Sequence, residues 1–361
     1  MSSDDVEARS PKRKNSIKSE DEDMGDNSSL AALPLVAQNE QWSRDPRYYF
    51  DDGNVVILAE DTIFRVHKGV LSLHSGVFKD LLNLPQPPGG ETLDSCPLVR
   101  IQDTAFHIKW LLETMYDGAA TILLHPKPEA PGSIAALYHL SLIGDKYAVE
   151  HLVEYVYKIL LVLFPTSDLS HWEPFTKRME HANLVRCDSK RVELALIVKM
   201  IRLWHPGATR LLPLVFYSYC QVPLNQINLK IEGDVAPLQP GDIQRCLTAI
   251  PGLFARKFQT YNVFSATGVD HDSCINPEEC GDALFQLSYS VMERKDIGNL
   301  PCPLEDLEKW CHKQEAWAKL CENCTDDIEL GISRFRLGTW FQLGLIFDLP
   351  EWEVGDTLPE P

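Results

Sequence analysis

Short apolar runs with turn residues at both ends mark strands in the first half of the chain. The apolar run 55–58 lies between Asp52-Gly53 and Glu60-Asp61, and residues 62–66 follow it with β-branched and aromatic side chains. This pattern predicts two strands that pair as a hairpin across an acidic turn. A third run, at 98–101, predicts another strand. Together these segments predict a small sheet.

The apolar positions then change to a helical period. Between residues 67 and 82 they suit two short helices broken near Ser75-Gly76, and after a cap at Asp103 or Thr104 they recur three and four apart. A later helical stretch, 134–163, divides near Gly144-Asp145. Loops rich in proline separate these elements. We therefore expect helices that cover the small sheet.

Past residue 164 the pattern is helical throughout. A nearly continuous apolar segment at 192–204 predicts a buried helix, and another at 211–217 follows with Thr209 as a cap. Further helices are predicted at 242–263, 278–293 and 304–323. The predicted fold class is α+β, with a small sheet capped by helices, followed by an all-α C-terminal region.

The first 41 residues are polar, rich in serine and charge, and carry almost no aromatic side chain. Such a segment cannot bury enough apolar surface to offset its ordering entropy, so we predict a disordered tail at 1–41. We then expect a first domain at 42–164, which folds by itself, and a helical region at 165–361. The tail holds a basic cluster, Lys12, Arg13 and Lys14, which is a candidate nuclear-import signal, although such runs also arise in solvated tails.

Charge and cysteine content narrow the classes of function. The formal net charge of -18 would repel a phosphate backbone or an anionic membrane, so we expect no direct nucleic-acid partner and no membrane partner. The opening residues show no apolar segment typical of a secretion signal, which predicts a cytoplasmic or nuclear protein. In those compartments the ten cysteines are expected to be free thiols.

The order of predicted elements and a set of particular residues resemble the BTB/POZ domain. The residues that carry this resemblance are Phe64-Arg65-Val66-His67-Lys68, Val70-Leu71, Ser75, Phe78, Leu111-Leu112, Tyr116-Asp117-Gly118, Gly144-Asp145-Lys146-Tyr147 and Leu152. In the second half, residues 211–217 and the ending 340–352 resemble BTB proteins of the type expanded in mushroom-forming fungi. The resemblance covers most of the chain outside the tail.

The resemblance implies a structural role for these residues and a docking role for the domain. His67 would be a core histidine bonded locally and Ser75 the N-cap of the second short helix. Phe78 and Leu81 would be the side chains that this helix buries. The family uses its helices and exposed strand edges for self-association and partner recruitment. We therefore expect a non-enzymatic protein-interaction protein or adaptor whose partners are other proteins.

Three departures from the family pattern weaken particular roles. Asn54 and Lys68 stand where many members place a charged pair at the dimer pocket, so a polar contact replaces the ion pair. Leu84-Pro85-Gln86 lacks the glutamate of the triplet that recruits cullin-type ubiquitin ligases, so a substrate-adaptor role is less favoured. Arg44-Asp45-Pro46 interrupts the segment where a swapped N-terminal helix would lie. These features predict a weak homodimer.

The cysteines near the C-terminus are the best candidates for chemistry. Cys302, Cys311, His312, Cys321 and Cys324 supply thiol and imidazole groups, and Cys321 and Cys324 have the spacing of a zinc ligand pair. A single pair is weak support, and on a helix at 304–323 these cysteines would share a stripe with Leu307, Trp310 and Trp317 as small apolar side chains. Cys274 and Cys280, beside His271, are too loosely spaced to strengthen the case. We expect no cofactor, with zinc at Cys311, Cys321 and Cys324 as the alternative.

Motifs of catalysis do not occur in the chain. It has no glycine-rich phosphate loop, no nucleophile elbow and no paired-histidine metalloprotease motif. The acidic groups near residues 305–308 and 326–329 are those of helix starts or solvated faces. We therefore expect an interaction protein, and the alternative from another class is a nuclear regulatory factor with a zinc-stabilised C-terminal module.

Overall fold

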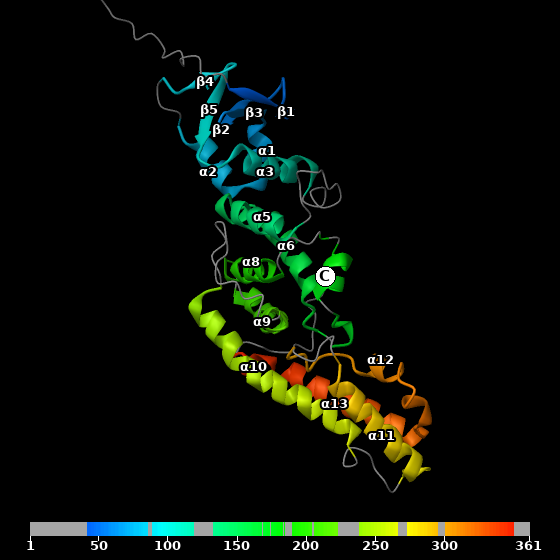
Figure 1. Ribbon diagram of the computed structural model, residues 1–361. Helices are drawn as coiled ribbons and strands as arrows, with labels where there is room; N and C mark the ends of the chain where they lie inside the picture. Colours follow the sequence, from blue (N-terminus) through cyan, green and yellow to red (C-terminus); the bar gives the residue numbers. More distant parts are fainter. Residues whose placement is uncertain are drawn as a thin grey trace, which may run out of the picture. The chain divides into compact units, whose positions relative to one another are not determined.

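The computed structural model describes residues 42–85, 89–118, 133–167, 169–173, 175–182, 184, 190–203, 206–222, 238–265, 273–294 and 300–349. A five-stranded sheet with its covering helices comes first, and a series of helices follows (Figure 1). This arrangement confirms the fold class predicted from the sequence.

The sheet is built around β2, whose five residues are all buried. Its strand order is β1-β3-β2-β5-β4, with β2 antiparallel to β3 and parallel to β5. The predicted hairpin is therefore confirmed, with Ile57 opposite Phe64. The strands are β1 (Ser43–Tyr49), β2 (Val55–Ala59), β3 (Thr62–Val66), β4 (Thr92–Leu93) and β5 (Cys96–Ile101).

Strand β1 forms where only an interrupted segment was expected. It pairs in parallel with β3 at one edge of the sheet, where the missing N–H of Pro46 is tolerated. The side chain of Asp45 accepts the backbone N–H groups of Arg47 and Tyr48, each at 2.9 Å, and so bends the strand locally. Its carboxylate also meets Nζ of Lys109 at 2.8 Å. The spacing of apolar residues along the chain does not predict these long-range contacts.

Among the described residues, five helices cover the sheet or follow it directly. Ser75 ends the first and caps the second as predicted, and Thr104 caps the third through a bond from the His107 N–H. The predicted break at Gly144-Asp145 lies too early, because that helix continues to Lys146 and the chain turns at Ala148, whose φ is 50°. The helices are α1 (Lys68–His74), α2 (Gly76–Asn83), α3 (Ala105–Asp117), α5 (Ile134–Lys146) and α6 (Glu150–Leu163).

The second half is helical, with one predicted helix placed wrongly. The segment 304–323 contains a short helix and a 3-10 turn, and extended backbone at Leu320 and Cys321 then starts a new long helix. Thr209 lies in a 3-10 turn and caps no helix. The helices are α7 (Phe175–His181), α8 (Lys190–Leu203), α9 (Leu212–Cys220), α10 (Pro240–Tyr261), α11 (Pro277–Met292), α12 (Glu308–Cys311), α13 (Glu322–Phe341) and α14 (Leu343–Ile346).

A large apolar core joins the sheet domain to the helices that follow. It runs from β2 and β3 through α3, α5 and α6 into α8, α9 and the first half of α10, and it includes Trp340 near the end of α13. Helix α6 ends at Leu163, beside the predicted domain boundary, but the buried core continues across this point. The division at residue 164 stays a prediction, and it marks a change of architecture within one core.

A smaller core lies between the end of α10, helices α11 and α12, and the first half of α13. Its members include Phe264, Leu287 and Ile328. Gly331 lets α13 approach closely here, because a Cβ at this position would stand 2.8 Å from Cγ1 of Val263. The two cores are connected by α10 and α13, each of which contributes residues to both.

Candidate interaction surface and metal centre

The two positions expected at the dimer pocket are in contact at the start of α1. Oδ1 of Asn54 accepts the backbone N–H of Lys68 at 2.8 Å. The polar contact between this pair therefore runs through the backbone of Lys68, and its ammonium group takes no part in it. Asn54 satisfies one of the N–H groups that the first turn of a helix leaves without an intrahelical partner.

His67 is held by neighbours on three sides. Its Nδ1 lies 2.9 Å from the hydroxyl of Tyr116, and its Nε2 lies 3.2 Å from Oδ1 of Asp52. The same hydroxyl accepts the backbone N–H of His67 at 3.0 Å, and the ring packs on Phe50 with centroids 5.2 Å apart. The side chain is 28% exposed, so this histidine lies at the rim of the core. Its contacts position α1 against α3.

Ser75 and Phe78 fasten α2 to the turn between α5 and α6. The Ser75 hydroxyl donates to the carbonyl of Tyr147 at 2.5 Å and accepts the Phe78 N–H at 3.0 Å. Phe78 is fully buried and stacks on the Tyr147 ring with centroids 4.9 Å apart. Around them the other motif residues are buried, with Tyr116 partly so: Phe64, Val66, Leu71, Leu111, Leu112 and Tyr116.

The opposite side of the same helix pair exposes apolar side chains. Leu73 near the end of α1 is 78% exposed, and Leu84 at the end of α2 is 61% exposed. Val77 and Leu81 lie between them on α2, one helical turn apart, and both are exposed. The expectation that α2 buries Leu81 is therefore wrong, because only Phe78 of this pair turns toward the core. We call these four residues the α1–α2 face. Exposed apolar side chains on neighbouring helices are typical of an interaction surface.

The sheet edges are less suited to docking than this helical face. Strand β1 forms one edge, where Pro46 lacks an N–H and the charged residues Arg44 and Arg47 are exposed. The other edge is β4, which is only two residues long. Proline, charge and shortness are the features that keep an edge from pairing with another strand. Association through added strands is therefore disfavoured.

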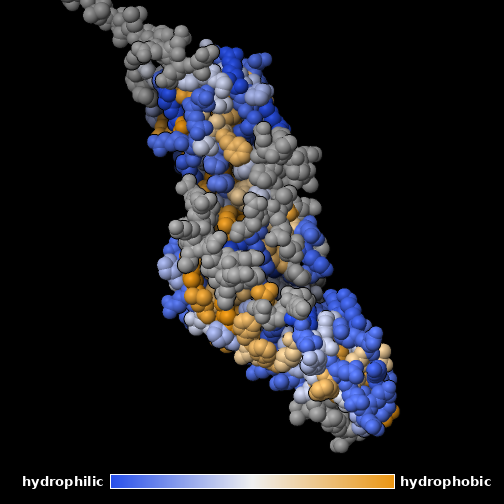
Figure 2. Space-filling model, in the orientation of Figure 1, coloured by the Kyte–Doolittle hydropathy of each residue, from blue (hydrophilic) through white to orange (hydrophobic). Residues whose placement is uncertain are grey.

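A second apolar surface lies along α10, where orange side chains gather in the space-filling view (Figure 2). Leu247 is 54% exposed and Phe258 is 49% exposed, and Phe254 stacks on Phe258 with ring centroids 6.4 Å apart. Their spacing of seven, four and eleven residues places them on one face of the helix. We call these three residues the α10 stripe.

A groove of about 490 Å³ separates the turn between α5 and α6 from the end of α8. Its walls are mainly apolar, from Val149, Val153, Tyr157, Leu203 and Ala208. The ionisable groups that line it are carboxylates: Asp145, Glu150 and Glu154. The lining offers apolar contact and negative charge, and it brings no nucleophile beside a base.

Several predicted site residues lie outside the described part of the chain. The import candidates Lys12, Arg13 and Lys14 belong to this group, as do Gln86 of the cullin-type triplet and His271. The roles assigned to them stay predictions.

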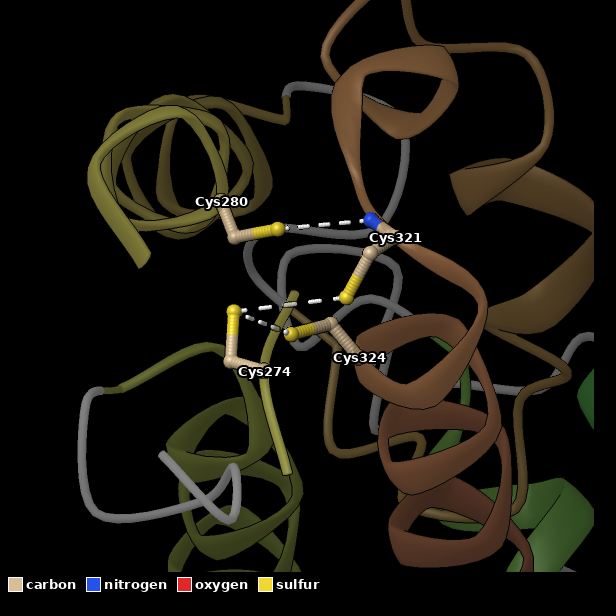
Figure 3. A group of neighbouring side chains, drawn as sticks. All are labelled: Cys274, Cys280, Cys321 and Cys324. Carbon is tan, nitrogen blue, oxygen red and sulfur yellow. Dashed lines mark hydrogen bonds between the residues drawn. The ribbon is translucent and has the colours of Figure 1, made fainter. Parts of the chain in front are cut away.

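Four cysteines far apart in the sequence meet at the starts of α11 and α13 (Figure 3). Cys274 and Cys280 flank the start of α11, Cys321 is the N-cap of α13, and Cys324 lies in its first turn. Sγ of Cys274 is 3.5 Å from Sγ of Cys324 and 4.0 Å from Sγ of Cys321. All four sulfur atoms lie within 4.8 Å of one another. Cys274 and Cys280, excluded on spacing, are thus brought in by the fold.

Backbone N–H groups point at these sulfur atoms. The Cys321 N–H donates to Sγ of Cys280 at 3.3 Å. N–H groups of Ile275 and Cys324 bond to the Cys321 thiol and lower its pKa to about 6. Burial raises the pKa of Cys280 and of Cys324, and neighbouring thiols raise that of Cys324 further. Of these three thiols, only that of Cys321 has a lowered pKa.

The remaining candidates for zinc binding do not join this group. Cys311 is fully buried in the smaller core, and burial raises its thiol pKa to about 12. Cys302 is also buried, with its pKa raised to about 12 for the same reason. Nε2 of His312 lies 3.0 Å from Oε1 of Glu329, near Glu308. Of the predicted ligands, only Cys321 and Cys324 lie together. The helix expected at 304–323, on which these two cysteines were to share a stripe with Leu307, Trp310 and Trp317, is interrupted.

Comparison with known proteins finds one family. Residues 48–161 match the BTB/POZ domain family, over strands β2 to β5, the helices α1, α2, α3 and α5, and most of α6. No curated protein and no solved structure matches the chain. The matched family is a protein-interaction module, and the region after it is mostly helical. None of the described helices is long and apolar enough to cross a membrane.

Proposed function

We propose that this chain is a non-enzymatic interaction protein that forms a weak homodimer through its BTB/POZ domain. The observation that carries this proposal is the α1–α2 face, which exposes four apolar side chains on helices that bury Leu71 and Phe78 against the core. Covering such side chains with those of a second copy removes apolar area from water, at about 25 cal/mol per Å². The net charge of -18 opposes the approach of two copies, which makes the dimer weak at low salt.

The domain is also proposed to recruit other proteins, as an adaptor in the cytoplasm or nucleus. The absence of a glutamate in Leu84-Pro85-Gln86 argues against the cullin-type ligase role that some family members have. The likeness of the helical half to BTB proteins of mushroom-forming fungi stays a prediction about its origin. The α10 stripe gives the helical half a contact surface of its own, suited to a partner other than the dimer mate.

Sedimentation velocity over a series of protein concentrations tests the dimer. We expect a monomer–dimer equilibrium that shifts toward dimer as salt rises past roughly 0.1 M, because screening relieves the repulsion between copies. The double variant Leu73→Asp, Leu84→Asp places two charges in the α1–α2 face and is expected to leave only monomer. The measurement uses the full chain, and circular dichroism of each variant confirms that it folds.

A matched control distinguishes the effect of a charge in the α1–α2 face from the effect of a charge at any other exposed apolar residue. Leu345 on α14 is 80% exposed, close to the 78% of Leu73, so Leu345→Asp removes a similar side chain elsewhere. This variant should dimerise like the native chain. A tight dimer that ignores salt and is lost in Leu247→Asp, Phe258→Asp would move the interface to the α10 stripe. A monomer at every concentration would exclude self-association and leave recruitment of other proteins.

A further inference from the structure

The four-cysteine group has the size of a filled tetrahedral site. A metal ion bound to four sulfur atoms at about 2.3 Å requires sulfur–sulfur separations of about 3.8 Å. The separations here are 3.5 Å and 4.0 Å for two of the pairs, with all four atoms within 4.8 Å. Paired disulfides would instead bring two sulfur atoms to about 2.05 Å and leave the two pairs apart. The atoms are thus arranged around a common centre.

The local backbone explains how these side chains converge. Cys321 and Cys324 occupy the N-cap and the third position of α13, which face the same way at a helix start, as in a capping box. Cys274 lies two residues before the N-cap Asn276, and Cys280 is the fourth helical residue of α11. Both pairs therefore lie at helix N-termini, where the unpaired N–H groups and the helix dipole favour negative charge. This is the environment that thiolate ligands need.

The exposure of the ligands suits a structural ion. Cys280 and Cys324 are buried in the smaller core, whereas Cys274 and Cys321 are partly exposed. An ion can therefore enter from the solvent side and complete its coordination with protein sulfur alone. With four protein ligands no position stays open for a substrate, which distinguishes structural from catalytic zinc.

The smaller core is of a size at which a cross-link between its helices would add to its stability. It has far fewer buried members than the large core, and two of them are cysteines of this group. Small cores of this kind are commonly stabilised by disulfides or by a metal ion. The described cysteines form no disulfide. An ion held by α11 and α13 together would join the two helices at one end of the core, and its binding energy would add to folding.

We propose that Cys274, Cys280, Cys321 and Cys324 bind one Zn²⁺ ion in a tetrahedral, structural site. All four ligands bind as thiolates, so binding releases the protons of those that are still thiols. Zinc is favoured over harder divalent ions because four soft sulfur ligands in a tetrahedron select zinc or iron. The site joins α11 to α13 and has no part in docking through the α1–α2 face.

Metal analysis of the purified full chain tests the proposal. We expect about one zinc per chain by mass spectrometry of the metal content, with little iron. Replacement of zinc by Co²⁺ should give the intense visible bands of a tetrahedral cobalt site and a sulfur-to-cobalt charge-transfer band. Cys274→Ser, which changes a partly exposed ligand, should lower zinc affinity by more than about 100-fold in competition with a chromogenic chelator.

Cys311→Ser is the matched control, because Cys311 is a buried thiol of the same core outside the group. This variant should keep its zinc and its cobalt spectrum even if packing lowers its stability. Equal loss of metal in both variants would show that metal content follows core packing, which contradicts the assignment of ligands. A native chain that holds no metal and gives no tetrahedral spectrum with Co²⁺ would overturn the site. Stoichiometric iron would overturn the choice of ion.

Discussion

The large core and the smaller core of this protein differ in size and in composition. The large core buries a sheet and several helices, and its buried members include Tyr48, Phe78 and Trp340. The smaller core has far fewer members and places four sulfur atoms around one point at its edge. Apolar burial rises with the size of a domain, so a small core has less to offset the entropy of folding. If the four cysteines bind a metal ion as proposed, that ion adds stability to the smaller core, which has less buried apolar surface than the large core.

Helices α10 and α13 connect the two cores, so a change in the stability of the smaller core also affects helices that pack in the large one. Helix α10 contributes Leu253 to the large core and Tyr261 to the smaller one, and α13 contributes Ile328 to the smaller core and Trp340 to the large one. The helices run in opposite directions between the cores. Loss of order in the smaller core would therefore shorten α10 and α13 before it reached the sheet domain.

The largest effect is expected from a cavity in the large core. Phe78→Ala should lower the free energy of unfolding by about 3 to 5 kcal/mol, because it removes a buried ring stacked on Tyr147. Chemical denaturation followed by circular dichroism measures this loss. Phe106, which is 45% exposed, provides the control, since Phe106→Ala should cost less than about 1 kcal/mol. Equal losses in the two variants would contradict the assigned packing of α2.

A cavity in the smaller core should act more locally. Leu287 on α11 is fully buried, so Leu287→Ala should lower the stability of this core by at least about 2 kcal/mol. With zinc present, an early denaturation phase should move to lower denaturant while the main phase of the sheet domain stays in place. A single transition that moves as a whole would show that the two cores unfold together.

A smaller effect, dependent on pH, is expected at the edge strand. Burial raises the pKa of Asp45, but hydrogen bonds from Lys109 and from the Tyr48 and Arg47 N–H groups outweigh this and hold it below its ordinary value of 3.8. As pH falls, the unfolded chain therefore takes up this proton first. The stability from Asp45 is present above pH 3.8 and is lost as pH falls through the folded pKa.

Asp45→Asn should therefore cost about 1 to 3 kcal/mol near pH 7 and little in strong acid. Urea denaturation at a series of pH values gives the difference between the variant and the native chain. Asp80→Asn, at an exposed position of α2, should show no such pH-dependent difference. A constant cost of Asp45→Asn at every pH would mean that its charge is not what holds β1.

Strands β2, β3 and β5 and the helices that cover the sheet were predictable because each follows a local pattern. The apolar run of β2, the Ser75 cap and the period of α3 are visible in a short window of sequence. Strand β1 was not predictable, since its pairing with β3 and the contact of Asp45 with Lys109 join residues far apart in the chain. The local sequence of β1 offered only Pro46, and a proline argues against a helix at that position without predicting a strand.

The metal centre was half predictable for the same reason. Cys321 and Cys324 share a local spacing that indicates ligands, whereas Cys280 reaches them only through the packing of α11 beside α13. Apolar residues between 304 and 320 recur at helical spacing, so the sequence predicted one continuous helix. The structure instead has extended backbone at Leu320 and Cys321, where α13 starts. An early sign was that Cys274 and Cys280 flank a residue pair, Asn276-Pro277, typical of a helix start.

Hydrogen exchange of the full chain with zinc, and after zinc removal by a chelator under reducing conditions, tests the contrast between the cores most directly. The account predicts that amides of α11 and of the first half of α13 lose protection when zinc is removed. Amides of β2, α3 and α5 should keep theirs. Unchanged protection in α11 and α13, or an equal loss throughout the chain, would contradict the claim that a metal ion holds the smaller core while burial alone holds the large one.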